Sequence, residues 1–148
     1  RVWMYDRPER NQFRFFHDLR VRWGEVDAQG VVFNPNYLVF ADVAGTEYLR
    51  AIGAFGADVS DLFVANANVN FRQSARFDDE LSIGVRVAHR GTTSLLFVIA
   101  MWRDEALIAD VALTYVRVDA ATGKPASPDL VVRLIEAYEG RPLNIRQA

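Results

Sequence analysis

The stretch from Arg22 to Tyr37 constrains this chain more than any other. Asp27 stands in a short polar turn that Gly30 closes, and Asn34-Pro35 has the pattern of a helix start, an N-cap amide followed by proline in the first turn. The sequence therefore places a carboxylate a few residues before a helix N-terminus. Unpaired N–H groups and the positive dipole end of a helix suit a developing oxyanion, so this combination is one way to build an acyl-transfer centre.

The residues after this turn predict a long, largely covered helix. Residues 36–52 are mostly apolar or small, apart from one polar stripe formed by Asp42, Thr46 and Arg50 at a spacing of four residues. Gly53 has the character of a left-handed helix end. A helix with so wide an apolar surface needs to be wrapped by another element.

Five further segments have the pattern of strands, and tight turns join the last of them, which predicts antiparallel pairing. Residues 94–102 are almost continuously apolar, as in a strand covered on both faces. Ser127 as N-cap and Pro128 at the first position predict a terminal helix to about Tyr138. One long helix against one curved antiparallel sheet is an α+β layout. The predicted strands are residues 16–23, 65–72, 81–88, 94–102 and 107–118.

Composition bounds the class of protein. With 148 residues we expect a single domain, 1–148, in which residues 1–15 form an arm that packs on the body. A net charge of −2 gives no reason to expect a nucleic-acid or membrane partner, and no apolar run approaches the ~20 residues of a membrane span. The absence of cysteine excludes thiolate chemistry and fits a reducing compartment, so we expect a cytoplasmic protein. Two isolated histidines, His17 and His89, do not predict a metal site.

The central stretch also carries a family resemblance. The run Trp23-Gly24-Glu25-Val26-Asp27-Ala28-Gln29-Gly30-Val31-Val32-Phe33-Asn34-Pro35-Asn36-Tyr37 resembles the signature of hot-dog-fold acyl-CoA thioesterases of the 4-hydroxybenzoyl-CoA thioesterase type. Weaker likenesses are Phe77-Asp78-Asp79-Glu80-Leu81 and Gly91-Thr92-Thr93-Ser94, and together they extend from about Phe16 to Val118. The chain departs from the pattern at Glu25, where the family often has Asp.

The resemblance implies a fold, a reaction and an assembly. It implies the hot-dog fold, with the sheet wrapped around the central helix, and hydrolysis of an acyl-CoA thioester to a carboxylic acid and coenzyme A. Asp27 is then the nucleophile or general base, and the backbone amide of Asn34 polarises the thioester oxygen. No cofactor is implied beyond coenzyme A as part of the substrate. The expected assembly is a homodimer or a dimer of dimers.

Each candidate residue can also have a purely structural role. Asp27 can be an ordinary turn aspartate and Asn34 only an N-cap, while Gly30 either lets the loop approach substrate or serves turn geometry. Val32, Phe33 and Tyr37 of the motif are predicted to contact substrate. Glu47 corresponds to the helix-borne carboxylate of some other hot-dog thioesterases, or lies at the margin of the polar stripe. Arg72, Arg76 and Arg90 suit the coenzyme A phosphates, with Arg90 as the preferred candidate, and each of them can instead be a surface charge.

Two other functions are weighed against thioester hydrolysis. A hydratase or dehydratase of the same fold relies on a histidine with a carboxylate, and neither histidine falls in the Asp27 turn or on the long helix. A non-catalytic acyl-thioester binding module or structural dimer needs no Asp27 motif. The sequence leaves open the acyl group, and the choice between coenzyme A and a carrier-protein thioester.

Overall fold

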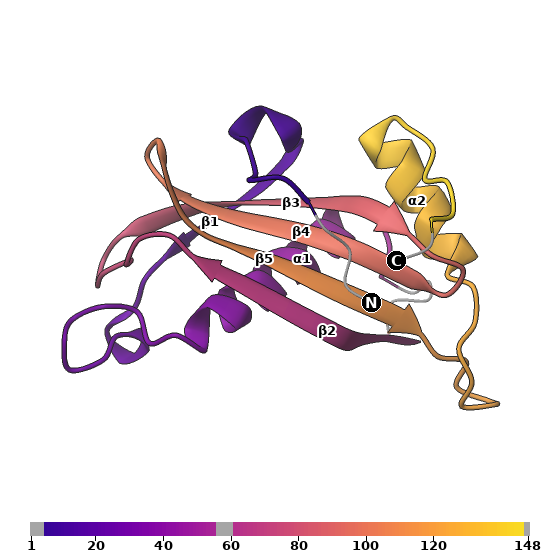
Figure 1. The fold of residues 1–148 in the computed structure, drawn as a ribbon, viewed down its shortest axis with the longest axis horizontal. Helices are drawn as coiled ribbons and strands as arrows, with labels where there is room; N and C mark the ends of the chain where they lie inside the picture. The colour runs from indigo at the N-terminus through magenta and orange to yellow at the C-terminus, as the bar shows by residue number, and fades with distance from the viewer. Residues whose placement is uncertain (1–4, 56–60, 147–148) are drawn as a thin grey trace.

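The computed structural model describes residues 5–55 and 61–146, and within them five strands form one antiparallel sheet in the order β1-β3-β4-β5-β2 (Figure 1). The α+β prediction is confirmed, and every predicted strand overlaps an observed one. The chain leaves β2 at one edge and crosses to β3, which lies beside β1. The strands are β1 (Phe15–Arg20), β2 (Leu62–Phe71), β3 (Glu80–Arg90), β4 (Ser94–Arg103) and β5 (Ala106–Arg117).

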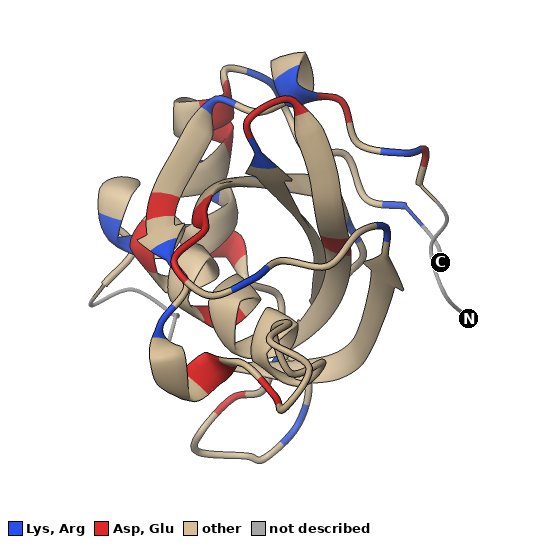
Figure 2. Cartoon of the chain, turned by 90° about the vertical axis from the view of Figure 1, so that its left-hand side faces the viewer, with Lys and Arg blue, Asp and Glu red and all other residues tan. Residues whose placement is uncertain are grey.

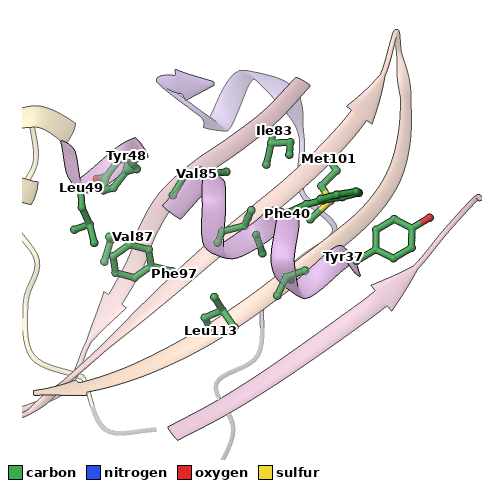
Figure 3. Packing of buried hydrophobic residues seen from close by; sticks show 14 of the residues in the cluster. Tyr37, Phe40, Tyr48, Leu49, Ile83, Val85, Val87, Phe97, Met101 and Leu113 are labelled. Atoms are coloured by element: carbon green, nitrogen blue, oxygen red, sulfur yellow. The ribbon is translucent and has the colours of Figure 1, made fainter. Parts of the chain in front are cut away.

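The long helix α1 (Asn36–Ala51) lies across one face of this sheet, behind it in Figure 1. Its buried side is fully apolar around Phe40 and Tyr48, which are both 0% exposed. These side chains meet a row of sheet residues that includes Ile83, Phe97 and Met101 (Figure 3). The predicted enclosure of the helix is therefore confirmed on this side.

Both helices begin one residue later than the predicted caps imply. Pro35 and Pro128 occupy the N-cap positions of α1 and of α2 (Asp129–Glu139), and neither helix start has a side-chain cap hydrogen bond. The predicted caps, Asn34 and Ser127, lie one residue further out. The Ser127 hydroxyl is engaged elsewhere, because it donates to Asp129 Oδ1 at 2.7 Å and accepts from the guanidinium of Arg90 at 3.2 Å.

The described part of the N-terminal arm covers the opposite face of the sheet. Phe13 packs against Trp102 with ring centroids 5.4 Å apart, and the Tyr5 hydroxyl donates to Asp110 Oδ1 at 2.7 Å. β4 is consequently buried on both faces from Leu95 to Trp102, which confirms the expectation from its continuous apolar run. Residues 1–4 of the arm, and residues 56–60 of the loop predicted after α1, lie outside the described residues.

Strand β2 is the exception to the covered sheet. It pairs only with β5, and most of its residues are exposed, on both faces. Asn66, Asn68 and Asn70 are exposed along this strand, and Phe63 and Val64 are also more than half exposed. In the described ranges no helix is long and apolar enough to cross a membrane. Figure 2 shows basic and acidic residues interspersed around the molecule.

Candidate active site

The Asp27 turn is a compact loop held by its own backbone. The Asp27 N–H donates to the Val31 carbonyl at 2.8 Å, and the Gly30 N–H returns a hydrogen bond to the Asp27 carbonyl at 2.9 Å. Gly30 has φ of 79°, so the turn itself requires glycine at this position. The Asp27 side chain is exposed, and its Oδ1 accepts from the Gln29 N–H at 2.8 Å. This is the Asx-turn geometry expected of an ordinary turn aspartate. It leaves the Oδ2 atom of Asp27 without a protein partner in the described residues.

Glu25 fixes this loop against the helix start, and sequence reasoning assigned it no such role. Its carboxylate accepts from the Arg22 N–H at 2.7 Å and from the Arg22 guanidinium at 2.8 Å, and the side chain is buried. Burial acts to raise the pKa of Glu25, but the hydrogen bonds and charge of Arg22 outweigh it, so the pKa lies below its usual value. The Arg22-x-x-Glu25 spacing was the available signal for this clamp.

The main-chain carbonyl of Glu25 connects the Asp27 loop to the start of α1. It accepts from the Phe33 N–H at 2.9 Å and from Nδ2 of Asn36, the first residue of α1, also at 2.9 Å. The loop that carries Asp27 and the turn that opens α1 are thereby held in one rigid unit. Asn36 is a second residue whose positioning role the sequence pattern did not reveal.

The helix start offers one free main-chain donor. The Asn36 N–H bonds to the Phe33 carbonyl and the Tyr37 N–H to the Asn34 carbonyl, while Pro35 has no N–H. The Asn34 N–H has no acceptor among the residues that the structure describes, and neither does its side chain. An unpaired N–H at the positive end of a 16-residue helix suits an anionic oxygen.

A pocket of about 180 Å³ opens beside this donor. Val32, Asn34 and Tyr37 line it from the motif, and Arg72 lines it from the end of β2. Tyr37 is 2% exposed and its hydroxyl accepts from the Ala75 N–H at 3.1 Å, so its ring is a fixed wall. Two of the three predicted substrate contacts within the motif thus meet at one pocket.

Phe33, the third predicted substrate contact, is largely exposed to solvent. It is 57% exposed and does not line the pocket. Trp23, which is 75% exposed, and Phe77 form a similar projecting pair near the loop, with ring centroids 5.2 Å apart. Such exposed aromatic side chains beside a site are available to a second chain or to a ligand.

Glu47 and Arg90 lie apart from this pocket. Glu47 pairs with Arg50 at 3.4 Å along α1, as its stripe-margin reading expects. Arg90 is 8% exposed, and its guanidinium bonds to Ser127 and lies 3.8 Å from Asp129. It therefore ties β3 to the start of α2, at the end of the sheet away from the Asp27 loop (Figure 1). Their assignment to substrate stays a prediction.

Arg72 is the polar side chain that reaches the pocket from the sheet. Its Nε donates to Asp110 Oδ2 at 2.9 Å, which orients the guanidinium, and Asp110 is 0% exposed. Sequence reasoning included Arg72 only as one of three arginines that suit phosphate. Among the described residues, no group of three or more His, Asp or Glu side chains is placed to hold a metal ion.

Comparisons with known proteins point to one family. A family model described as the thioesterase superfamily matches residues 29–109. The acyl-CoA thioester hydrolase YbgC of Escherichia coli is 31% identical over 128 residues, which is 82% of this chain and 96% of the relative. The acyl-CoA thioesterase YbgC of Haemophilus influenzae is 25% identical over 118 residues, or 76% of this chain and 87% of the relative.

Solved structures give the same result. A Thermus thermophilus thioesterase, crystallised with coenzyme A and zinc, superposes with a TM-score of 0.78 and 26% identity over 88% of this chain and 98% of that one. The YbaW probable thioesterase of Escherichia coli superposes with a TM-score of 0.74 over 81% of this chain and 97% of that one, at 22% identity. The five-stranded antiparallel sheet with one long helix is the arrangement of these neighbours, and the expected hot-dog fold is confirmed.

Proposed function

The chain belongs to the thioesterase superfamily and is a thioester hydrolase, and from that premise we propose that it cleaves acyl-CoA at the Asp27 loop. The observation that carries the proposal is the free Asn34 N–H at the helix start, held in one unit with the exposed Asp27 carboxylate by Glu25 and Asn36. The thioester oxygen accepts from this N–H, and its developing negative charge is stabilised there.

Asp27 then supplies the attack on the thioester carbon. As general base its carboxylate takes a proton from water, and the hydroxide adds to the carbonyl carbon before the thiolate of coenzyme A leaves. As nucleophile it forms an acyl anhydride that water later hydrolyses. A trapped anhydride identifies the second route. In a single turnover in labelled water, the general-base route is identified when no anhydride forms and the label appears in the product acid.

The pocket beside Asn34 is small and open, and we propose that a second copy of the chain completes it. β2 forms a free sheet edge with exposed Phe63 and Val64, and an unpaired edge of this kind is a template for strand pairing. Two copies related by a twofold axis can pair their β2 edges antiparallel. The dimer remains a proposal that rests on the family resemblance, and a cytoplasmic location remains a proposal that rests on the absence of cysteine.

The decisive experiment compares two aspartates with the same local geometry. Asp119 also accepts a backbone N–H from two residues ahead, Ala121, at 2.8 Å. We expect Asp27→Asn to lower kcat for thiol release from acyl-CoA by about 10²–10⁴-fold, while Asp119→Asn keeps it. Near-unchanged turnover in a folded Asp27→Asn protein would remove the proposal. A panel of acyl chain lengths identifies the substrate, and binding without thiol release would indicate a binding module.

A further inference from the structure

A second hollow lies on the face of the sheet opposite α1, under the N-terminal arm. It has a volume of about 420 Å³, and Arg86, His89 and Arg146 line it together with residues of the arm. An adjoining pocket of about 260 Å³ shares His89 and Arg146 and adds Arg141. We call the two together the arm pocket. Their volumes lie near the lower end of the range of small-molecule sites.

The arm pocket and the Asp27 loop are at opposite ends of the molecule. β3 begins at the end where the Val21 N–H bonds to the Asp79 carbonyl, and it ends at Arg90 beside the arm pocket. The eight steps along the strand from Leu81 to His89 extend about 26 Å. Figure 1 shows α2 near one end of the strands and the loop before α1 near the other end. A ligand in the arm pocket is therefore distinct from a thioester at Asp27 of the same chain.

Three guanidinium groups line the arm pocket, and none of them has a carboxylate partner among the described residues. Arg141 donates to the Val87 carbonyl at 2.7 Å, and Nη1 of Arg146 lies 2.9 Å from the ring nitrogens of His89. Nε of Arg86 is buried without a hydrogen-bond partner. In residues 5–55 and 61–146 no ion pair involves any of the three arginines.

The nearby acidic groups leave this charge incompletely balanced. Asp6 lines the hollow, and the charge of Glu139 reaches Arg86, but the Glu139 carboxylate is engaged by the Tyr48 hydroxyl at 2.6 Å. Burial lowers the pKa of Arg86, and the charge of Arg141 lowers it further. Burial likewise lowers the pKa of His89, and the charges of Arg146, Arg86 and Arg141 act in the same direction.

Cations placed this close together favour an anionic ligand. A guanidinium group donates two parallel hydrogen bonds to a phosphate or carboxylate, and a dianion offsets several converging cations better than a monoanion does. The packing of Arg86 against the Phe13 ring, with its guanidinium carbon 5.7 Å from the centroid, fixes one donor in place. The pocket is thus built before any ligand arrives.

We propose that the arm pocket binds a phosphate group of a small molecule, held by Arg86, Arg141 and Arg146. The phosphate comes either from a free phosphorylated metabolite or from the nucleotide part of coenzyme A. Phosphate binding at this pocket is measured without thioester hydrolysis, so this proposal and the one at Asp27 fail separately.

The test uses sodium pyrophosphate as the probe, with sodium chloride at equal ionic strength as its control. Near 100 times the dissociation constant, pyrophosphate is expected to raise Tm by about 5 °C above the salt control. Arg146→Gln is expected to weaken pyrophosphate binding in titration calorimetry by about tenfold or more. Arg133→Gln, which removes one exposed charge of α2 outside the pocket, is expected to keep the affinity.

The same titrations identify the source of the phosphate. Adenosine 3′,5′-bisphosphate binding about tenfold more tightly than pyrophosphate assigns the pocket to the coenzyme A nucleotide, and weaker or equal binding assigns it to a free phosphate compound. Binding is also expected to raise the pKa of His89 in NMR titration, because the bound anion offsets the charges of the nearby arginines. A Tm rise equal to that in salt, or equal affinity in wild type and Arg146→Gln, would overturn the proposal. Arg86→Gln adds a second variant if it folds, and Arg146→Gln decides alone if it does not.

Discussion

The side-chain amide of Asn36 donates to the main-chain carbonyl of Glu25 across 2.9 Å, so the first residue of α1 is bonded to the segment that leads into Asp27. The Phe33 N–H donates to the same oxygen. This carbonyl therefore sets the relative position of the two parts of the proposed site, although it touches neither reacting group.

Loss of the Asn36 amide is expected to lower catalysis more than stability. Asn36→Ala removes one neutral hydrogen bond, which is worth about 1 kcal/mol of unfolding free energy. A displaced loop costs far more in rate, because a shift of about 1 Å in a reacting group lowers turnover by about 100-fold. Urea unfolding and kcat for thiol release measure the two effects. Asn11→Ala, at an exposed position of the arm, is the control, and unchanged kcat in Asn36→Ala would contradict the positioning role.

The Glu25 clamp is expected to make stability depend on acidity. Because the folded-state pKa of Glu25 lies below its usual value, its stabilising contribution is complete above that usual value and is lost as the pH falls through the folded pKa. Glu25→Gln is expected to lower the free energy of unfolding by about 1–2 kcal/mol at pH 7. The difference between wild type and variant should shrink below about pH 4. A difference that stays constant from pH 7 to pH 3.5 would show that the Arg22 contacts do not stabilise the charged form.

Gly84 is expected to tolerate no side chain under the arm. A Cβ built on it would lie 2.8 Å from both Cγ and Cδ1 of Phe13, atoms close to the backbone of a ring that is itself fixed against Trp102. Gly84→Ala is therefore expected to destabilise by about 1–3 kcal/mol, despite the better strand propensity of alanine. Gly24→Ala is the control, because nothing lies within 4 Å of its Cβ position. Thermal unfolding compares them, and equal Tm values would show that the arm yields.

The fold was largely predictable because apolar periodicity reports burial directly. The run Ser94 to Trp102 predicted a doubly covered strand, and the mostly apolar surface after Pro35 predicted the enclosed helix. The placement of β2 beside β5 was not predictable, since strand order depends on crossover connections that leave no local pattern. For the site, too, only the features that lie in a local sequence pattern were predictable. Asp27 and Asn34 stood in a local motif, whereas the contact between Asn36 and Glu25 spans 11 positions and appears only in three dimensions.

The free edge of β2 gives the prediction that joins assembly to catalysis. Val64 is 53% exposed on this edge, and a lysine there is a device by which sheet edges avoid pairing. Val64→Lys is therefore expected to weaken the dimer by about tenfold or more, measured by sedimentation equilibrium.

If the second copy completes the pocket beside Asn34, kcat falls as the protein is diluted below the new dissociation constant. Leu130→Lys on α2, at a leucine that is 47% exposed, controls for the added charge. A monomeric wild type with full activity would separate the thioesterase chemistry from dimer formation, because Asp27 and the Asn34 N–H of one chain would then suffice.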